Sequence, residues 1–376
     1  EWSGDRGVGA LYFSQQAVFR LASRADITVL TGVTDAERLK AVQEKLEAGD
    51  EGALKIWQTI GIYLGYALVG IGAAAMGPVP CSAVISNWFE RRRGFAVGLM
   101  SAGIGAGGVV MAPLVGFMLS HFDWRTAYLA MAVLITAVSV PLALLTIRTR
   151  PADMGLYPDG DAAPAPSSTR PSLIDAGGFT LRQALGTPVF WLMAIAFSFS
   201  NFANMGAIQS SAPFLEDIGY PTALAASALG AIGFGSGSGK ILFGWLCDKI
   251  RANLACAIGI GMQLAAVLML LTLRADSPLI VIWAYALLLG LGVGAWLPTL
   301  SLLTSTSFGL LFYGAVFGAL NLCQSLGTAA GPLFAGAVHD VTGSYHGAFI
   351  TAAILLAISL PSALLVKRPR RPATTS

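Results

Sequence analysis

Long apolar stretches separated by short polar segments dominate the chain from residue 58 onward. A helix needs about 20 apolar residues to cross a bilayer core about 30 Å thick, and its backbone groups are then paired internally. Nine stretches meet this requirement, at residues 60–86, 95–119, 126–147, 188–212, 223–246, 254–273, 279–302, 313–337 and 346–366. The pattern predicts an all-α membrane protein with nine transmembrane helices.

Basic residues predict how these helices are oriented. If successive loops alternate sides, one side carries 13 Lys and Arg residues, whereas the other carries only Arg125 and Arg274. Loops rich in Lys and Arg stay on the cytoplasmic side. The basic tail at residues 367–376 is therefore expected in the cytoplasm. We expect a multi-pass protein of the bacterial inner membrane.

Composition supports this interpretation and excludes several other classes. Hydrophobic residues make up 55% of the chain and charged residues 11%, whereas a soluble domain has about 25% charged residues. A net charge of +3 does not indicate nucleic acid binding. The four cysteines lack metal-ligand or paired spacing, and no catalytic set of side chains is visible. We therefore expect no enzyme activity, no cofactor and no metal.

A polar segment divides the apolar part of the chain. Residues 148–187 are rich in Pro, Gly, Ser and Ala until "FTLRQAL", which predicts a linker that ends in a short amphipathic helix. The predicted layout is a polar segment at 1–57, three helices at 58–147, the cytoplasmic linker, and a six-helix bundle at 188–366 before the tail.

An internal repeat relates the two apolar parts. A shift of 220 residues aligns "GIGAAAMGP" with "GLGVGAWLP" and superposes six glycines between residues 70 and 116 on glycines of the second bundle. The three helices at 58–147 then match the last three of the second bundle. Helices that match the first three of the second bundle are expected before residue 58, but no apolar stretch of that length occurs there. We therefore expect a truncated or recombined reading frame.

Residues 1–57 are polar and contain a predicted charged helix, "DAERLKAVQEKLEAGDEGALKIWQTI". With nine spans and a cytoplasmic C-terminus, this segment falls outside the cell, although no signal-peptide pattern precedes it. A dedicated N-terminal domain is the alternative to a recombined frame.

The stretch "NWFERRRGFAVGLMSAGIGAGG" with the following "WR", the segment "RPADMGLYPDG", and the helices "TPVFWLM" and "GKILFGWLCDK" resemble the major facilitator superfamily. Within it they are similar to oxalate/formate antiporter-like and monocarboxylate transporter-like members. The resemblance covers residues 58–366 and implies a major facilitator fold with nine of its twelve helices present. The segments "YFSQQAVFRLA" and "AERLKAVQEKLEAGDEGALKIWQTIGIYLGYAL" are instead similar to a fragment of a ROK sugar-kinase-like protein, without its catalytic motifs.

Lys240 is the one ionisable side chain placed well inside an apolar stretch. It precedes Asp248 by eight residues, which puts it about 12 Å deeper than the loop. An ammonium at that depth costs at least about 2.5 kcal/mol and is tolerated where it faces a cavity or partner. Three roles remain open: a counter-charge for an anionic substrate, part of a G-x-x-x-G-x-x-x-D-K loop motif, or a side chain that snorkels to the interface. The resemblance favours the first, because monocarboxylate transporter-like members have a basic residue here.

The subgroup's pattern is met only in part. Monocarboxylate-type members have an acidic residue where this chain has Ser236, and oxalate-type members have a second lysine where it offers Asn321 and Gln324. Asn204 and Gln209 are further candidates to line a substrate path, although buried amides commonly serve helix packing. The predicted cytoplasmic latch consists of Arg91, Arg92, Arg93, Asp248 and Lys249.

These features support a secondary transporter that moves a small organic anion, such as a monocarboxylate, by alternating access with a proton or counter-anion. Its other expected partner is the lipid bilayer. Two alternatives remain: a truncated chain that transports nothing, and a membrane sensor whose input domain is residues 1–57.

Overall fold

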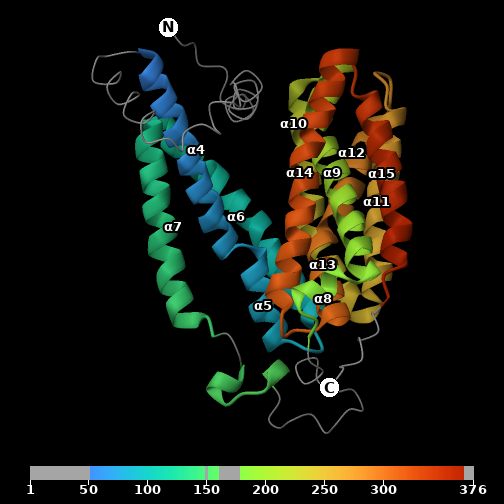
Figure 1. Cartoon of the computed structure of the whole chain (residues 1–376). Coiled ribbons are helices and arrows are strands. Elements are labelled where there is room, and N and C mark those ends of the chain that lie inside the picture. Colours follow the sequence, from blue (N-terminus) through green and yellow to red (C-terminus); the bar gives the residue numbers. More distant parts are fainter. Residues whose placement is uncertain (1–50, 149–150, 161–177, 368–376) are drawn as a thin grey trace. The chain divides into compact units, whose positions relative to one another are not determined.

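The computed structural model describes residues 51–148, 151–160 and 178–367, where every regular element is helical (Figure 1). The predicted charged helix spans residues 35–60, and the sugar-kinase-like stretch continues to residue 68. Their parts before residue 51 lie outside the described residues, and the remainder belongs to α4. The helices are α4 (Glu51–Met76), α5 (Pro78–Trp88), α6 (Arg93–His121), α7 (Trp124–Thr146), α8 (Leu181–Leu185), α9 (Pro188–Asp217), α10 (Thr222–Lys249), α11 (Ala252–Thr272), α12 (Leu279–Gly294), α13 (Trp296–Phe308), α14 (Tyr313–Thr342) and α15 (His346–Leu364). Two 3₁₀ turns, η1 (Pro151–Met154) and η2 (Pro158–Gly160), follow α7.

The chain divides into two compact units, Glu1–Ala73 and Ala74–Ser376. The described part of the first unit is α4 up to Ala73, and this helix runs without interruption through the predicted boundary at residues 57 and 58. The features discussed below all belong to the second unit.

Seven helical runs in the described residues are long and apolar enough to cross a membrane. The predicted spans at 223–246 and 313–337 are also long helices, α10 and α14, but they are not among these seven. Each contains at least five glycines, which lower its hydropathy. An all-helical membrane fold is therefore confirmed, whereas the number nine stays a prediction.

Two predicted spans are each divided into two helices. The span at 60–86 is interrupted at Gly77, before Pro78, and the span at 279–302 is interrupted at Ala295. Helix α13 also continues to Phe308, so the loop expected at 303–312 is shorter than predicted.

The element boundaries reproduce the sequence repeat. Helices α5 and α13 end at Trp88 and Phe308, and α6 and α14 begin at Arg93 and Tyr313, so each pair is 220 residues apart. The repeat thus includes the positions where whole helices begin and end, in addition to the glycine positions.

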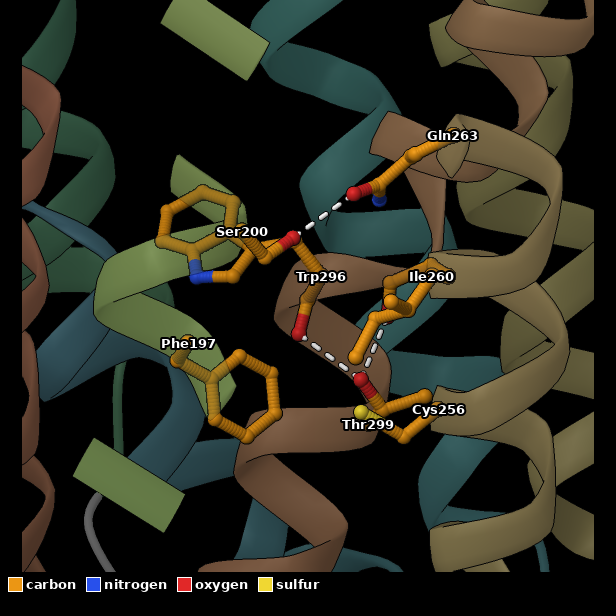
Figure 2. Close-up of a pocket in the computed structure, with 8 residues that line it drawn as sticks. Phe197, Ser200, Cys256, Ile260, Gln263, Trp296 and Thr299 are labelled. Atoms are coloured by element: carbon orange, nitrogen blue, oxygen red, sulfur yellow. Dashed lines mark hydrogen bonds between the residues drawn. The ribbon is translucent and has the colours of Figure 1, made fainter. Parts of the chain in front are cut away.

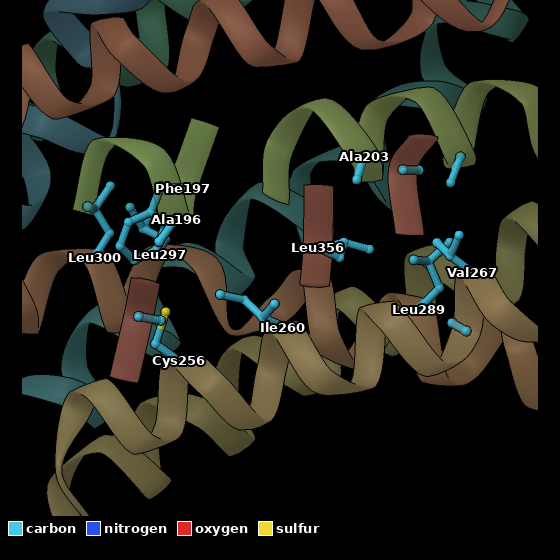
Figure 3. Close-up of a cluster of buried hydrophobic side chains, with 14 of the residues drawn as sticks. Ala196, Phe197, Ala203, Cys256, Ile260, Val267, Leu289, Leu297, Leu300 and Leu356 are labelled. Atoms are coloured by element: carbon cyan, nitrogen blue, oxygen red, sulfur yellow. The ribbon is translucent and has the colours of Figure 1, made fainter. Parts of the chain in front are cut away.

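Helices α9 to α15 form a bundle around a continuous apolar core (Figure 1). Figure 3 shows part of this core, where side chains of α9 and α11 meet those of α12, α13 and α15. The apolar window of α9 is 61% buried, whereas that of α7 has no buried residue. In a membrane, the apolar side chains that the protein leaves uncovered contact lipid.

The helices of this bundle approach one another through glycines spaced four residues apart. Gly235 and Gly239 of α10 face Gly290 and Gly294 of α12, so that a Cβ at Gly239 would lie 2.6 Å from the carbonyl oxygen of Leu291. Equivalent contacts join α9 to α14 through Gly206, Gly327 and Gly331. Helices α6 and α10 approach each other in the same way through Gly94, Gly98 and Gly244. Glycine permits this approach because it has no side chain between the backbones.

The linker ends as predicted in a short helix. The Thr180 hydroxyl accepts a hydrogen bond from the Gln183 amide, and the Gln183 side chain accepts one from the Thr180 amide, which forms a capping box at α8.

The glycine contacts lead to a prediction about stability. Gly239→Ala should lower the thermal unfolding temperature of the purified protein, because the added methyl group meets backbone that cannot move aside, at a cost of about 1–3 kcal/mol. Gly237→Ala on the same helix is the matched control, because nothing lies within 4 Å of its Cβ position and alanine favours helix by up to about 1 kcal/mol. Tryptophan fluorescence during heating in detergent measures both. Equal unfolding temperatures for the two variants would contradict this account of the packing.

Candidate functional site

Lys240 lies where three helices meet. A Cβ at Gly98 of α6 would collide with the Lys240 carbonyl oxygen, and one at Gly294 of α12 would lie 2.6 Å from the Lys240 amide nitrogen. Glycines on both sides therefore fix the backbone of Lys240 between α6 and α12. Its side chain is half-buried, and within the described parts of the chain it makes no ion pair or side-chain hydrogen bond.

One side of α10 is open in the two to three turns before Lys240. Ser236 precedes Lys240 by one turn and is half-buried. Gly230, Gly233 and Gly237 have no atom within 4 Å of their Cβ positions. The helix is thus closely packed against α12 at Gly235 and Gly239 and open where Gly230, Gly233 and Gly237 lie.

A first network of polar side chains joins α9, α11 and α12. Asn204 Nδ2 donates to Ser200 Oγ at 3.5 Å, and Ser200 Oγ donates to Gln263 Oε1 at 2.6 Å. Gln263 Nε2 then donates to the carbonyl oxygen of Gly292 at 2.8 Å. This carbonyl lies beside the interruption at Ala295, where the regular backbone pairing of the helix changes. Gln263 therefore supplies a donor to an acceptor near the break.

One acceptor in this network is left over. Asn204 is buried, and its Oδ1 atom has no hydrogen-bond partner in the described structure. A buried acceptor without a donor costs free energy.

Figure 2 shows a small cavity beside the break, between α9, α11 and the start of α13. Its volume is about 10 Å³, roughly the space of one water molecule. It is too small for an organic anion. Its lining residues are Phe197, Ser200, Cys256, Ile260, Gln263, Ala295, Trp296 and Thr299.

A second network joins α13 to α14. Trp296 Nε1 donates to Gln324 Oε1 at 2.6 Å, and Gln324 Nε2 donates to Asn321 Oδ1. Gln324 is buried and Asn321 is half-buried. The structure thus brings together Asn321 and Gln324, two of the predicted path residues.

The predicted path residues do not form one cluster. Gln209 is half-buried on α9, five residues after Asn204, so the two side chains leave the helix in different directions. No hydrogen bond in the described structure joins Lys240 to either amide network.

At the cytoplasmic end predicted from charge, Asp248 of α10 binds the first turn of α6. Its Oδ1 accepts from the amide of Gly94 at 2.7 Å, and its Oδ2 accepts from the amide of Phe95 at 2.8 Å. The first amides of a helix have no partner within the helix and carry a partial positive charge, so a carboxylate is well placed there. This contact connects the two halves of the internal repeat.

The basic residues of the predicted latch differ in their surroundings. Arg93 is buried, and its guanidinium donates to the carbonyl oxygens of Ser86 and Phe89, each at 3.0 Å. Arg91 is exposed and pairs with Asp159 of the linker, with 3.6 Å between Nε and Oδ2. Arg92 and Lys249 are exposed.

Four residues with evident roles were not predicted as site residues: Ser200, Gln263, Trp296 and Asp159. Gln263 has a signal in the sequence, because it is the one amide side chain in the apolar stretch 254–273. Asp159 has a weaker one, the turn sequence Pro-Asp-Gly. Nothing local distinguishes Ser200 or Trp296 from packing residues.

Comparison with known proteins shows which family this chain resembles in sequence. The family model described as Major Facilitator Superfamily matches residues 53–332. Monocarboxylate transporter 13 of Bos taurus is 28% identical over 297 residues, which cover 78% of this chain and 65% of that protein. Monocarboxylate transporter 12 of Xenopus laevis is 24% identical over 330 residues (84% and 70%), and monocarboxylate transporter 11 of Homo sapiens is 26% identical over 321 residues (81% and 64%). The chain thus spans about two thirds of the length of these relatives.

A solved structure shows the same fold. A variant of the E. coli fucose:proton symporter FucP matches 77% of this chain and 72% of its own, with a TM-score of 0.55 and 14% sequence identity. The same protein in its outward conformation gives a TM-score of 0.54. At this identity the likeness concerns the fold alone. Because the family model covers most of the chain, this protein is a multi-pass membrane protein that belongs to the Major Facilitator Superfamily.

Proposed function

We propose that this protein is a secondary transporter of small organic monocarboxylate anions that works by alternating access. The observation that carries the proposal is Lys240, a half-buried ammonium at a three-helix crossing without an ion-pair partner among the described residues. A charge in this setting is destabilising until an anion neutralises it. The similarity to monocarboxylate transporters supports an organic anion as that partner.

The open surface of α10 beside Lys240 supports access of a solute to the ammonium. Ser236 contributes a hydroxyl one turn away. Asn204, Gln209, Asn321 and Gln324 provide further polar groups along the path. The anion moves together with a proton or in exchange for another anion.

The contact between Asp248 and α6 supports a gate at the cytoplasmic end. It joins two helices from different halves of the repeat through two charge-assisted hydrogen bonds. Such a contact holds one end of the transporter closed and is broken when the halves separate. We also propose that the C-terminus faces the cytoplasm, because Lys and Arg are concentrated on that side.

Uptake by proteoliposomes tests the role of Lys240. Lys240→Met keeps the unbranched apolar stem of the side chain but removes the terminal ammonium and its charge. We expect uptake of a labelled monocarboxylate such as pyruvate to fall about tenfold or more at low concentration, because about 1.4 kcal/mol of lost binding gives each factor of ten. Lys367→Met, which changes an exposed lysine next to the tail, is the control and should transport normally. Equal uptake by Lys240→Met and the parent chain would refute the assigned role.

Competition between anions tests the substrate class. A single ammonium neutralises one carboxylate, and a second carboxylate on the same substrate would enter the membrane without a partner. Unlabelled propionate should therefore inhibit pyruvate uptake more strongly than the same concentration of succinate. If succinate inhibits equally well, a monocarboxylate site built on one charge is the wrong model.

A further inference from the structure

The linker turn at residues 158–160 binds the loop between α5 and α6. Asp159 Oδ2 accepts hydrogen bonds from the amides of Glu90 at 3.2 Å and Arg91 at 3.0 Å. The Asp159 side chain is only 11% exposed, although that of its ion-pair partner Arg91 is 67% exposed. We propose that Asp159 is a positioning residue of the cytoplasmic latch, which holds this loop in the form that Asp248 can bind. The inference builds on the proposed alternating-access function.

The loop is held through its own backbone. Asp159 takes the amides of Glu90 and Arg91, and Asp248 takes those of Gly94 and Phe95. Two carboxylates from different parts of the chain thus bind four amides within six residues. Both pairs of amides can be bound at the same time only when the short segment between them has a matching conformation.

Arg93 is a buried cation beside the loop that the two carboxylates bind. Its guanidinium closes the end of α5 by binding the carbonyl oxygens of Ser86 and Phe89. It also interacts electrostatically with Asp159 and Asp248. Glu90 of the same loop interacts with this cation as well, so in the described structure Arg93 lies in the electrostatic field of three acids without a direct ion pair to Asp159 or Asp248.

Asp159 is suited to this role by its backbone. Its φ angle is 60°, in the left-handed region, and Gly160 follows it. Aspartate and asparagine adopt this conformation more easily than most residues. Asp159→Asn therefore removes the charge while it keeps the turn.

The arrangement gives the linker a part in the gate. Asp248 belongs to the bundle of α9 to α15, whereas Asp159 precedes that bundle along the chain. When the contact at Asp248 opens, Asp159 still holds the loop in its binding form, so that the latch can close again. Without Asp159, the first turn of α6 loses the alignment of its two free amides and the closed state becomes less favourable.

Cys247 is a built-in reporter of the closed latch. It is buried, and a Cβ at Gly94 would lie 2.9 Å from its Cβ atom. The rest of its side chain belongs to a buried cluster with Phe243, Ala255 and Ala295. We expect separation of α6 from α10 to uncover the side of Cys247 that faces Gly94 and to speed labelling of its thiol. The experiment uses the full chain with Cys81, Cys256 and Cys323 replaced by alanine, in proteoliposomes without substrate, and measures the rate at which N-ethylmaleimide labels Cys247.

We expect Asp159→Asn to raise the labelling rate about fivefold, because neutral hydrogen bonds are roughly half as strong as charge-assisted ones. Asp159→Ala should raise it at least as much, and Asp248→Asn should raise it more. Asp123→Asn is the matched control. Asp123 also accepts from a backbone amide, that of Arg125, and pairs with the same arginine, but it begins α7 at the opposite end of α6 from Asp248. Its replacement should leave the rate unchanged.

Two results would overturn the proposal: a parental rate in both Asp159 variants, or an equal increase in Asp123→Asn, which would indicate general loosening. If Asp248→Asn labels Cys247 at the parental rate, Asp248 does not act as a latch, and the inference about Asp159 is refuted as well. Labelling requires no transport. A chain that fails to take up pyruvate but shows faster labelling in Asp159→Asn would reject the proposed substrate and uphold the latch.

Discussion

The structure depends on the direct contact of helix backbones through glycine. In lipid, apolar side chains gain little by leaving their surroundings, so close van der Waals packing has to hold helices together. Gly235 and Gly239 on α10, with Gly290 and Gly294 on α12, bring two backbones into contact along several turns. Gly98 and Gly244 do the same for α6 and α10. These contacts determine where Lys240 lies, because its own amide and carbonyl groups are part of both crossings.

The same packing explains why the charged and polar residues are arranged as they are. An ammonium held by its backbone at a fixed depth cannot move with its helix toward water without disturbing two neighbouring helices. The amides of Gln263 and Gln324 bind across helices in the same bundle. In the hydrocarbon region such bonds matter because water is not present to replace them.

Much of this fold is predictable from the sequence. Apolar length indicates the helices and the glycine pattern indicates the repeat, because both features reflect local requirements of a helix in lipid. The interruption at Gly77 has a local signal, because Pro78 follows it, whereas the one at Ala295 is harder to predict. An apolar stretch of 24 or more residues has the same composition whether it is one helix or two, and Ala295 has no local property that ends a helix.

The site is less predictable than the fold. Lys240 and Asp248 are conspicuous because a charge in an apolar stretch, or at its end, needs a reason. Ser200 and Trp296 are ordinary residues of apolar helices, and their partners lie 63 and 28 positions away in the chain. Asp159 belongs to a segment whose composition is typical of a linker. Its role depends on a loop nearly 70 residues earlier, and such pairings are fixed by tertiary structure alone.

The hydrogen bond from Gln263 to Gly292 has a consequence for movement within the bundle. An uninterrupted helix that bends must separate a backbone donor from its acceptor, and in hydrocarbon nothing replaces either partner. Here an amide on a flexible side chain can follow the carbonyl oxygen as α12 and α13 change their angle. The carbonyl of Gly292 can therefore keep a hydrogen-bond donor while the angle between α12 and α13 changes.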